Sequence, residues 1–154
     1  MDSSGQDAKT ELNSSTQAWS WSKITPFFSK YGCSVQSCVF YLPPDCSSQP
    51  GTFCCALNLS DAIIKANYSL PDASMVNYCP HGRVRNADGM ARICRVQNGG
   101  KIDVSGWDNR PSWKGIVYFE GNEVTQHIDF WDGRQALHKS YPNASVVWFW
   151  RMGT

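Results

Sequence analysis

The sequence predicts an α+β domain in which helices come first and an antiparallel sheet follows. Apolar residues recur with helical spacing in residues 53–67, whereas the last third of the chain contains three short runs rich in β-branched and aromatic residues. Helices and strands that are segregated along the chain are typical of α+β folds. The length of 154 residues is sufficient for one domain with a substantial core.

The clearest predicted helix covers residues 53–67. Thr52 is a suitable N-cap, and Ser48 is the alternative if the helix begins earlier. The stretch NYSLP ends the helix before Pro71, because a residue that precedes proline disfavours helical geometry. The apolar residues that share its buried side are Phe53, Ala56, Leu57, Ile63 and Ile64.

The part of the chain before this helix is expected to contain a leader and a loop linked by disulfides. Residues 1–17 are polar, and we interpret them as a disordered leader that precedes one domain at 18–154. Residues 18–32 show a helical pattern that a proline interrupts. Residues 33–52 contain three cysteines, three prolines and a glycine, which indicates a loop held by disulfides, with one short strand at 38–42.

The C-terminal third changes to a strand pattern. Residues 114–121 and 124–131 are separated by a short Gly-Asn-Glu turn, which is typical of a β-hairpin. Residues 144–152, ASVVWFWRM, form a third strand that is aromatic enough to lie in a core. Residues 71–113, between the helix and the hairpin, are expected to be mostly loop.

Composition narrows the classes of function. A net charge of +1 argues against nucleic acid or an anionic membrane as the partner. No apolar run reaches the roughly 18–20 residues that span a bilayer, and the polar N-terminus does not resemble a secretory signal. The seven cysteines nonetheless indicate an oxidising compartment. Their odd number leaves one thiol over after complete pairing.

Two adjacent cysteines, Cys54 and Cys55, lie at the start of the predicted helix. A helix N-terminus stabilises a thiolate through its N–H groups and its dipole, so this is a suitable place for a nucleophile. Side chains of consecutive helical residues point about 100° apart. One sulfur can therefore face a cleft while the other turns to a neighbouring loop. The alternative is that both are bridged or simply buried.

A nucleophilic thiol needs a base, and His127 lies in the predicted strand 124–131, on the same face as Asp129. A cysteine at a helix start that faces a histidine on a strand is the arrangement of papain-type hydrolases. His138 follows the WDGR turn, where the chain should run back beside His127, and could orient its ring. Each histidine alone is equally compatible with an ordinary surface or hydrogen-bonded role.

Four short motifs together resemble the type VI secretion amidase effectors, most closely the fourth family. They are CALNLSDAI at 55–63, WKGIVYF at 113–119, HIDFWDG at 127–133 and VVWFW at 146–150. The resemblance covers roughly residues 18–151, in the family's order. It implies a papain-like NlpC-type fold and hydrolysis of the γ-D-glutamyl–meso-diaminopimelate bond in peptidoglycan stem peptides, without a cofactor.

The resemblance also implies residue roles: Cys55 is the nucleophile, His127 is the base, and Cys54 is one of six paired cysteines. The family's third catalytic residue, an Asp, falls on His138, and related NlpC-type peptidases use a second histidine there. We therefore assign His138, with Asp129 and Asp132 as alternatives. Asp129 lies two residues along the same strand, which we regard as a poor position from which to orient His127. The positions that depart from the family motifs are Asn58 and Gln126, where the family has Arg and usually Gly.

Other polar and aromatic segments carry weaker signals. Residues 81–95 contain four arginines, which could hold stem-peptide carboxylates or could form a solvated loop pinned by Cys79 and Cys94. Trp107 and Trp113, in loops rich in Gly, Asp and Pro, are candidates for lining a substrate cleft. No second Cys/His pair has zinc-finger spacing, so no metal site is expected.

The leading hypothesis is an antibacterial effector toxin that acts in the periplasm of target bacteria. A cognate immunity protein that blocks the cleft is the partner that the resemblance implies. One alternative is a non-catalytic, disulfide-rich secreted module that binds cell-wall glycan through exposed tryptophans. Another is an amidase of the same fold that cuts the D-Ala–diaminopimelate crosslink. A secreted eukaryotic relative of these effectors is a third alternative.

Overall fold

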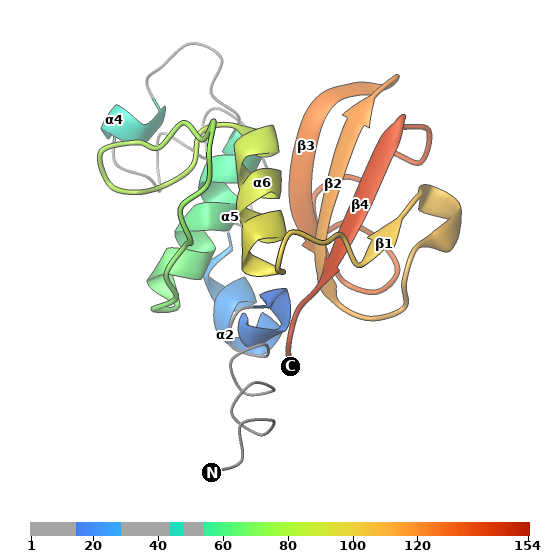
Figure 1. Cartoon of the computed structure of the whole chain (residues 1–154), viewed down its shortest axis with the longest axis horizontal. Helices are drawn as coiled ribbons and strands as arrows, with labels where there is room; N and C mark the ends of the chain where they lie inside the picture. The colour runs from blue at the N-terminus through green and yellow to red at the C-terminus, as the bar shows by residue number, and fades with distance from the viewer. Residues whose placement is uncertain (1–14, 29–43, 48–53) are drawn as a thin grey trace.

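Helices pack against one side of a four-stranded antiparallel sheet (Figure 1). The computed structural model describes residues 15–28, 44–47 and 54–154. The α-helices are α2 (Trp21–Ile24), α4 (Pro44–Ser47), α5 (Cys54–Lys65) and α6 (Ala87–Gln97). The 3-10 helices are η1 (Thr16–Ala18), η2 (Thr25–Phe27) and η3 (Trp107–Asn109). The strands are β1 (Val104–Ser105), β2 (Gly115–Gly121), β3 (Val124–Trp131) and β4 (Val146–Arg151). The predicted α+β class is confirmed.

The sheet has the strand order β1-β4-β2-β3, so β3 is an edge strand. The β2–β3 hairpin is the one that the sequence predicts, with Ile116 opposite Phe130 and Phe119 opposite His127. Asn122 adopts a positive φ of 63° in its tight turn. The predicted third strand is β4, which pairs with β2 on the other side, and the prediction of all three strands is confirmed.

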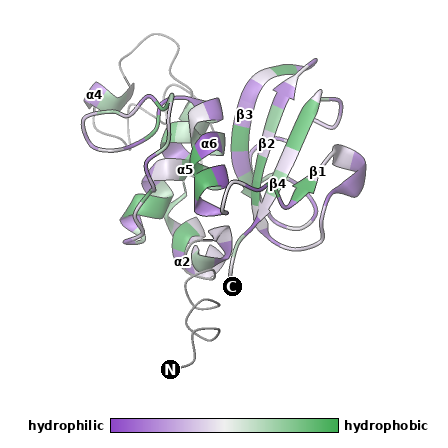
Figure 2. Cartoon of the chain, viewed as in Figure 1, coloured by the Kyte–Doolittle hydropathy of each residue, from purple (hydrophilic) through white to green (hydrophobic). Residues whose placement is uncertain are grey.

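Both faces of the sheet are covered, which explains why β2 is buried along most of its length. One face packs on α5 and α6, and the main core there includes Leu59, Ile63, Met90, Ile93, Ile116, Ile128, Phe130 and Trp150. The other face is covered by loops, with a second core of Val117, Phe119, Trp131, Ala136, Val147 and Phe149. Figure 2 shows hydrophobic segments along α5 and α6 and along the strands of the neighbouring sheet.

Helix α6 is the main element that the sequence analysis missed, and the prediction of loop over residues 71–113 is wrong there. Ala87, Met90, Ala91 and Cys94 are buried at the i, i+3, i+4 and i+7 positions of one helix face. The arginines and Gly89 between them obscure this pattern. Gly89 is required by close packing, because a Cβ there would lie 2.3 Å from the Asn86 side-chain oxygen.

The two ends of the described chain are joined. The Gly153 N–H donates to the Trp19 carbonyl, and the Trp21 N–H donates to the Gly153 carbonyl. Thr16, within the expected leader, is fully buried in the adjoining η1. Residues 1–14 of the expected leader lie outside the described residues.

Most of the predicted N-terminal loop also lies outside the described residues, as do the candidate caps Thr52 and Ser48 and the short strand at 38–42. Within the expected helical region 18–32, the structure describes only the short α2 and the 3-10 turns on either side of it. The predicted helix at 53–67 is confirmed as α5, Cys54–Lys65.

The cysteines divide into bridged sulfurs and thiols. Cys46 and Cys79 form a disulfide that ties α4 to the loop before α6. Cys54 is also disulfide-bonded. Cys55 and Cys94 are both buried thiols. The expectation of six paired cysteines is therefore wrong, because Cys94 lies in the helix core and not in a loop bridged to Cys79.

Candidate active site

Cys55 is the second residue of α5 and is only 4% exposed. Its neighbour Cys54 is held by a disulfide, which anchors the start of the helix. The first N–H groups of a helix have no intrahelical acceptor and are directed toward the N-terminus, so they favour negative charge on a sulfur there. Helix α5 packs against β3, and this packing brings the thiol to the edge of the sheet.

His127, on β3, is the ring that Cys55 meets. The two side chains are hydrogen-bonded, and His127 is 6% exposed. The Nε2 atom of His127 lies 2.8 Å from Oδ2 of Asp129. Residues two apart on a strand share a face, so the pleat aligns the carboxylate with the ring. A thiol, an imidazole and a carboxylate therefore form one chain of hydrogen bonds.

Asp129 is completely buried and is held by backbone donors. Its Oδ1 accepts the Phe130 N–H at 2.8 Å. Its Oδ2, besides the contact with His127, accepts the N–H groups of His138 at 3.0 Å and Lys139 at 3.1 Å. A buried carboxylate is costly unless its oxygens are satisfied, and here backbone donors from β3 and from the following loop meet that need.

The proton on His127 is held tightly. Burial lowers the pKa of the imidazole, but the hydrogen bonds and negative charges of Asp129 and Cys55 outweigh it and raise the pKa from 6.5 to about 9. An imidazolium beside a sulfur at a helix start favours the thiolate. The arrangement is thus suited to a thiolate–imidazolium pair at neutral pH.

Aromatic rings surround the imidazole. Phe119 stacks on it with centroids 6.1 Å apart, and Tyr141 meets it edge-on at 5.4 Å. Tyr118 lies on the helix-facing side of the sheet, and the pKa of its hydroxyl is raised. The causes are burial, the hydrogen bond to Glu120 and the negative charges of Glu120, Asp88 and Cys55. These rings hold the imidazole in one orientation and exclude water from the sulfur's surroundings.

His138 lies beside the site, in the loop that follows β3. Its ring stacks on Phe28, with centroids 4.3 Å apart, and its backbone N–H contacts Asp129. The argument that Asp129 is badly placed to orient His127 is wrong, because two residues on one strand face lie close enough for their side chains to meet. Asp132 instead stabilises its own turn by accepting the backbone N–H groups of Arg134 and Gln135.

The two tryptophan candidates lie on the loop-covered face of the sheet, which also carries Phe119 and Trp131. Trp107 and Trp113 both pack, half-buried, against the second core. Trp107 meets Trp131 edge-on at 5.6 Å and stacks under Arg110 at 4.8 Å. Trp107 also lies 6.3 Å from the Phe119 ring, and Phe119 stacks on His127, so a single ring separates Trp107 from the imidazole.

The four arginines of residues 81–95 separate into two pairs. Arg83 forms an ion pair with Asp61 at 3.0 Å, and Arg85 is buried and donates to the Cys46 and Tyr78 carbonyls. These two hold the loop to α4 and α5. Arg92 and Arg95 project from α6. Gln126, a departure from the family motif, accepts the Asp88 N–H at 3.4 Å and so links β3 to the first turn of α6.

The comparisons with known proteins concern the fold. No protein-family model and no curated protein matches the sequence. The structure is similar to that of the type VI effector Tae4 from Enterobacter cloacae, with a TM-score of 0.51 and 20% identity over 64% of this chain and 71% of that one. The chain has the Tae4 fold. A second similar structure is Tae4 from Salmonella typhimurium in complex with the immunity Tai4 from Enterobacter cloacae, with a TM-score of 0.48 and 15% identity over 65% of this chain and 74% of that one.

The Tae4 fold observed here contains neither a spanning helix nor an evident metal centre within the described residues. None of the helices in that part of the chain is long and apolar enough to cross a membrane. Among the same residues, no three His, Cys, Asp or Glu side chains are grouped so that they could hold a metal ion.

Proposed function

We propose that this protein is a cysteine amidase that hydrolyses the γ-D-glutamyl–meso-diaminopimelate bond of peptidoglycan stem peptides. The observation that supports the proposal most strongly is the hydrogen-bonded series Cys55–His127–Asp129, built between a helix start and an adjacent strand. The Tae4 fold and the four sequence motifs point to the same chemistry.

Cys55 is the nucleophile in this proposal. Its Sγ attacks the amide carbonyl carbon, and the carbonyl oxygen becomes an oxyanion. The N-terminus of α5, including the N–H of Cys55, is positioned to stabilise that charge. Because Asp129 engages Nε2 of His127, the other ring nitrogen serves the sulfur and the departing amine.

His127 transfers the protons. In acylation the imidazolium protonates the leaving amine as the C–N bond breaks, which leaves a thioester on Cys55 and a neutral ring. The neutral ring then takes a proton from water. The resulting hydroxide equivalent attacks the thioester, releases the carboxylic acid and restores the thiolate.

Asp129 orients the ring in this proposal, and His138 acts through it. The carboxylate fixes the tautomer of His127 and stabilises its cationic form. The backbone N–H of His138 helps to hold that carboxylate, and its side chain packs on Phe28. His138 is thus proposed as a positioning residue. Trp107 and Trp113 remain candidates for lining the substrate site, and Trp107 lies one ring away from His127.

The biological setting follows from the same proposal. An effector that cuts cell-wall stem peptides acts in the periplasm of target bacteria, where disulfides such as Cys46–Cys79 persist. A producing bacterium then needs an immunity protein that closes the cleft around Cys55.

Digestion of purified Gram-negative sacculi tests the proposal. Wild type is expected to release fragments cut between D-glutamate and diaminopimelate, identified by mass spectrometry. Cys55→Ala should release none, and Cys94→Ala, which removes the second buried thiol, should match wild type below its melting temperature.

Other outcomes of the digest distinguish the alternatives. Fragments cut between D-alanine and diaminopimelate would show that the enzyme cleaves the crosslink and not the γ-D-glutamyl bond. Intact sacculi that retain the bound protein would contradict the enzymatic proposal and favour a glycan-binding module. Unchanged activity in Cys55→Ala would remove Cys55 from the mechanism.

A further inference from the structure

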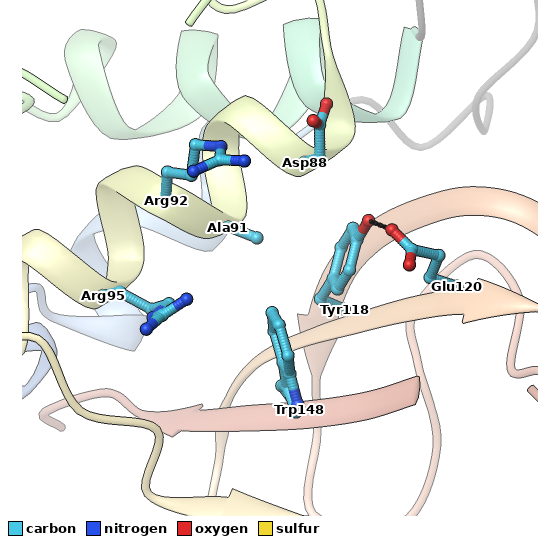
Figure 3. Close-up of a pocket in the computed structure, with 7 residues that line it drawn as sticks. All are labelled: Asp88, Ala91, Arg92, Arg95, Tyr118, Glu120 and Trp148. Carbon is cyan, nitrogen blue, oxygen red and sulfur yellow. Dashed lines mark hydrogen bonds between the residues drawn. The ribbon is translucent and has the colours of Figure 1, made fainter. Parts of the chain in front are cut away.

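A charged pocket lies between α6 and the helix-facing side of the sheet. It has a volume of about 230 Å³. Figure 3 shows Arg92 and Arg95 on the α6 side and Tyr118, Glu120 and Trp148 on the sheet side. Asp88 belongs to the first turn of α6 and closes one end.

The two arginines of this pocket, Arg92 and Arg95, have no anionic partner in the part of the chain that the structure describes. The Nε atom of Arg92 is buried and has no hydrogen-bond partner. Arg95 lies over the Trp148 ring at 5.7 Å, which holds its guanidinium at the pocket. A buried donor without an acceptor is costly, and a carboxylate is the group that an Arg fork accommodates best.

The pocket also carries negative charge, from Glu120 on β2 and from Asp88 in the first turn of α6. Glu120 accepts a hydrogen bond of 2.6 Å from the Tyr118 hydroxyl, which fixes the carboxylate at the rim. Asp88 accepts from the Asn86 side chain at 3.0 Å. Neither carboxylate has a cationic partner among the described residues. Two cations and two anions around one pocket fit a ligand that carries both a carboxylate and an ammonium.

Tyr118 connects this pocket to the candidate active site. It lines the pocket, and it lies close enough to Cys55 for a negative sulfur to raise the pKa of its hydroxyl. Asp88, at the other end, donates its backbone N–H to Gln126, the residue before His127. Arg92 and Arg95 also border a second hollow beside Ala73 and Gly100, but Tyr118 is not part of it.

We infer that this pocket binds the α-amino-carboxylate end of the diaminopimelate side chain on the leaving-amine side of the substrate. Arg92 and Arg95 take its carboxylate, and Glu120 and Asp88 take its ammonium. The inference rests on the proposed function for the identity of the peptide. It makes the protein selective for diaminopimelate over lysine, because lysine has the ammonium but lacks the second carboxylate.

Two synthetic stem peptides that differ only in diaminopimelate or lysine at the third position test the pocket. Wild type should favour the diaminopimelate peptide in kcat/KM by about tenfold to hundredfold, the range of a charge-assisted contact. Arg92→Gln should reduce that preference to less than about threefold. Glu120→Gln should lower both rates together, because both peptides carry the ammonium. The exposed turn variant Arg134→Gln should keep the wild-type preference.

A binding measurement separates this inference from the proposed function. Calorimetry with Cys55→Ala, alone and combined with Arg92→Gln, reports the pocket without cleavage. Suppose that the diaminopimelate peptide binds preferentially, that this binding depends on Arg92, and that wild type hydrolyses neither peptide. This result would support the proposed binding pocket and contradict the proposed amidase activity. Equal cleavage of both peptides, or a preference that persists in Arg92→Gln and Arg95→Gln, would overturn the pocket. If Arg92→Gln does not fold, the exposed Arg95→Gln provides the same comparison.

Discussion

The two thiols in the described part of the chain, Cys55 and Cys94, have nearly the same exposure and very different surroundings. Cys55 is 4% exposed at the start of α5, beside an imidazole that is itself held by a carboxylate. Cys94 is fully buried in the last turns of α6 among apolar side chains, and burial raises the pKa of its thiol.

The difference shows that burial alone does not make a sulfur reactive. A helix N-terminus and a cationic ring stabilise the thiolate, whereas an apolar core near a helix C-terminus destabilises it. Cys94 contributes to packing, whereas in the proposed mechanism Cys55 depends on Asp129 and His127 for its reactivity.

Removing the support behind the imidazole should have the largest effect on this contrast. Asp129→Asn is expected to lower kcat by about 10²- to 10⁴-fold, because the amide cannot stabilise the imidazolium. His138→Phe keeps the backbone N–H that contacts Asp129 and is expected to cost less than about tenfold. Single-turnover hydrolysis of a stem peptide measures both rates. A larger loss of rate in His138→Phe than in Asp129→Asn would indicate that His138 is the third catalytic residue.

Alkylation compares the two sulfurs directly. At pH 7, iodoacetamide should modify Cys55 at least about 100-fold faster than Cys94, because the thiolate is the reactive form. Mass spectrometry of the timed reaction identifies the modified residue, and His127→Ala should remove most of the difference. Equal rates in the wild type would contradict the assignment of a thiolate to Cys55.

Titration of His127 tests the electrostatic part of the comparison. Its folded pKa of about 9 lies above the ordinary 6.5, so the stability that the imidazolium adds is complete below pH 6.5 and lost as the pH rises to about 9. Acylation should decline over the same alkaline range, because His127 can no longer protonate the leaving amine. In Cys55→Ala, the NMR midpoint of His127 should fall, since one hydrogen bond and one negative charge are gone. An unchanged midpoint would show that the Cys55 sulfur does not contribute to the raised pKa of His127.

Much of this contrast is visible in the sequence, because it depends on local periodicity. Helical spacing gives α5 with Cys55 in its first turn, and alternation gives β3 with His127 and Asp129 on one face. The contact between Asp129 and His127 was not predicted, because the order of residues does not report side-chain reach or the backbone donors around a carboxylate. Helix α6 was missed because arginines and a glycine interrupt its apolar face. Without this helix, neither the burial of Cys94 nor the charged pocket could be predicted.

The smallest expected effect concerns Cys94. Cys94→Ser replaces a buried sulfur with a hydroxyl among apolar side chains, and it should lower the free energy of unfolding by about 1–3 kcal/mol. Urea denaturation measures this change, with Cys94→Ala as the control that leaves a small void without a polar group. Both variants should retain wild-type hydrolysis at temperatures where they are folded. A loss of activity in folded Cys94→Ala would contradict this separation of roles. It would mean that the Cys94 sulfur supports the active site as well as the core.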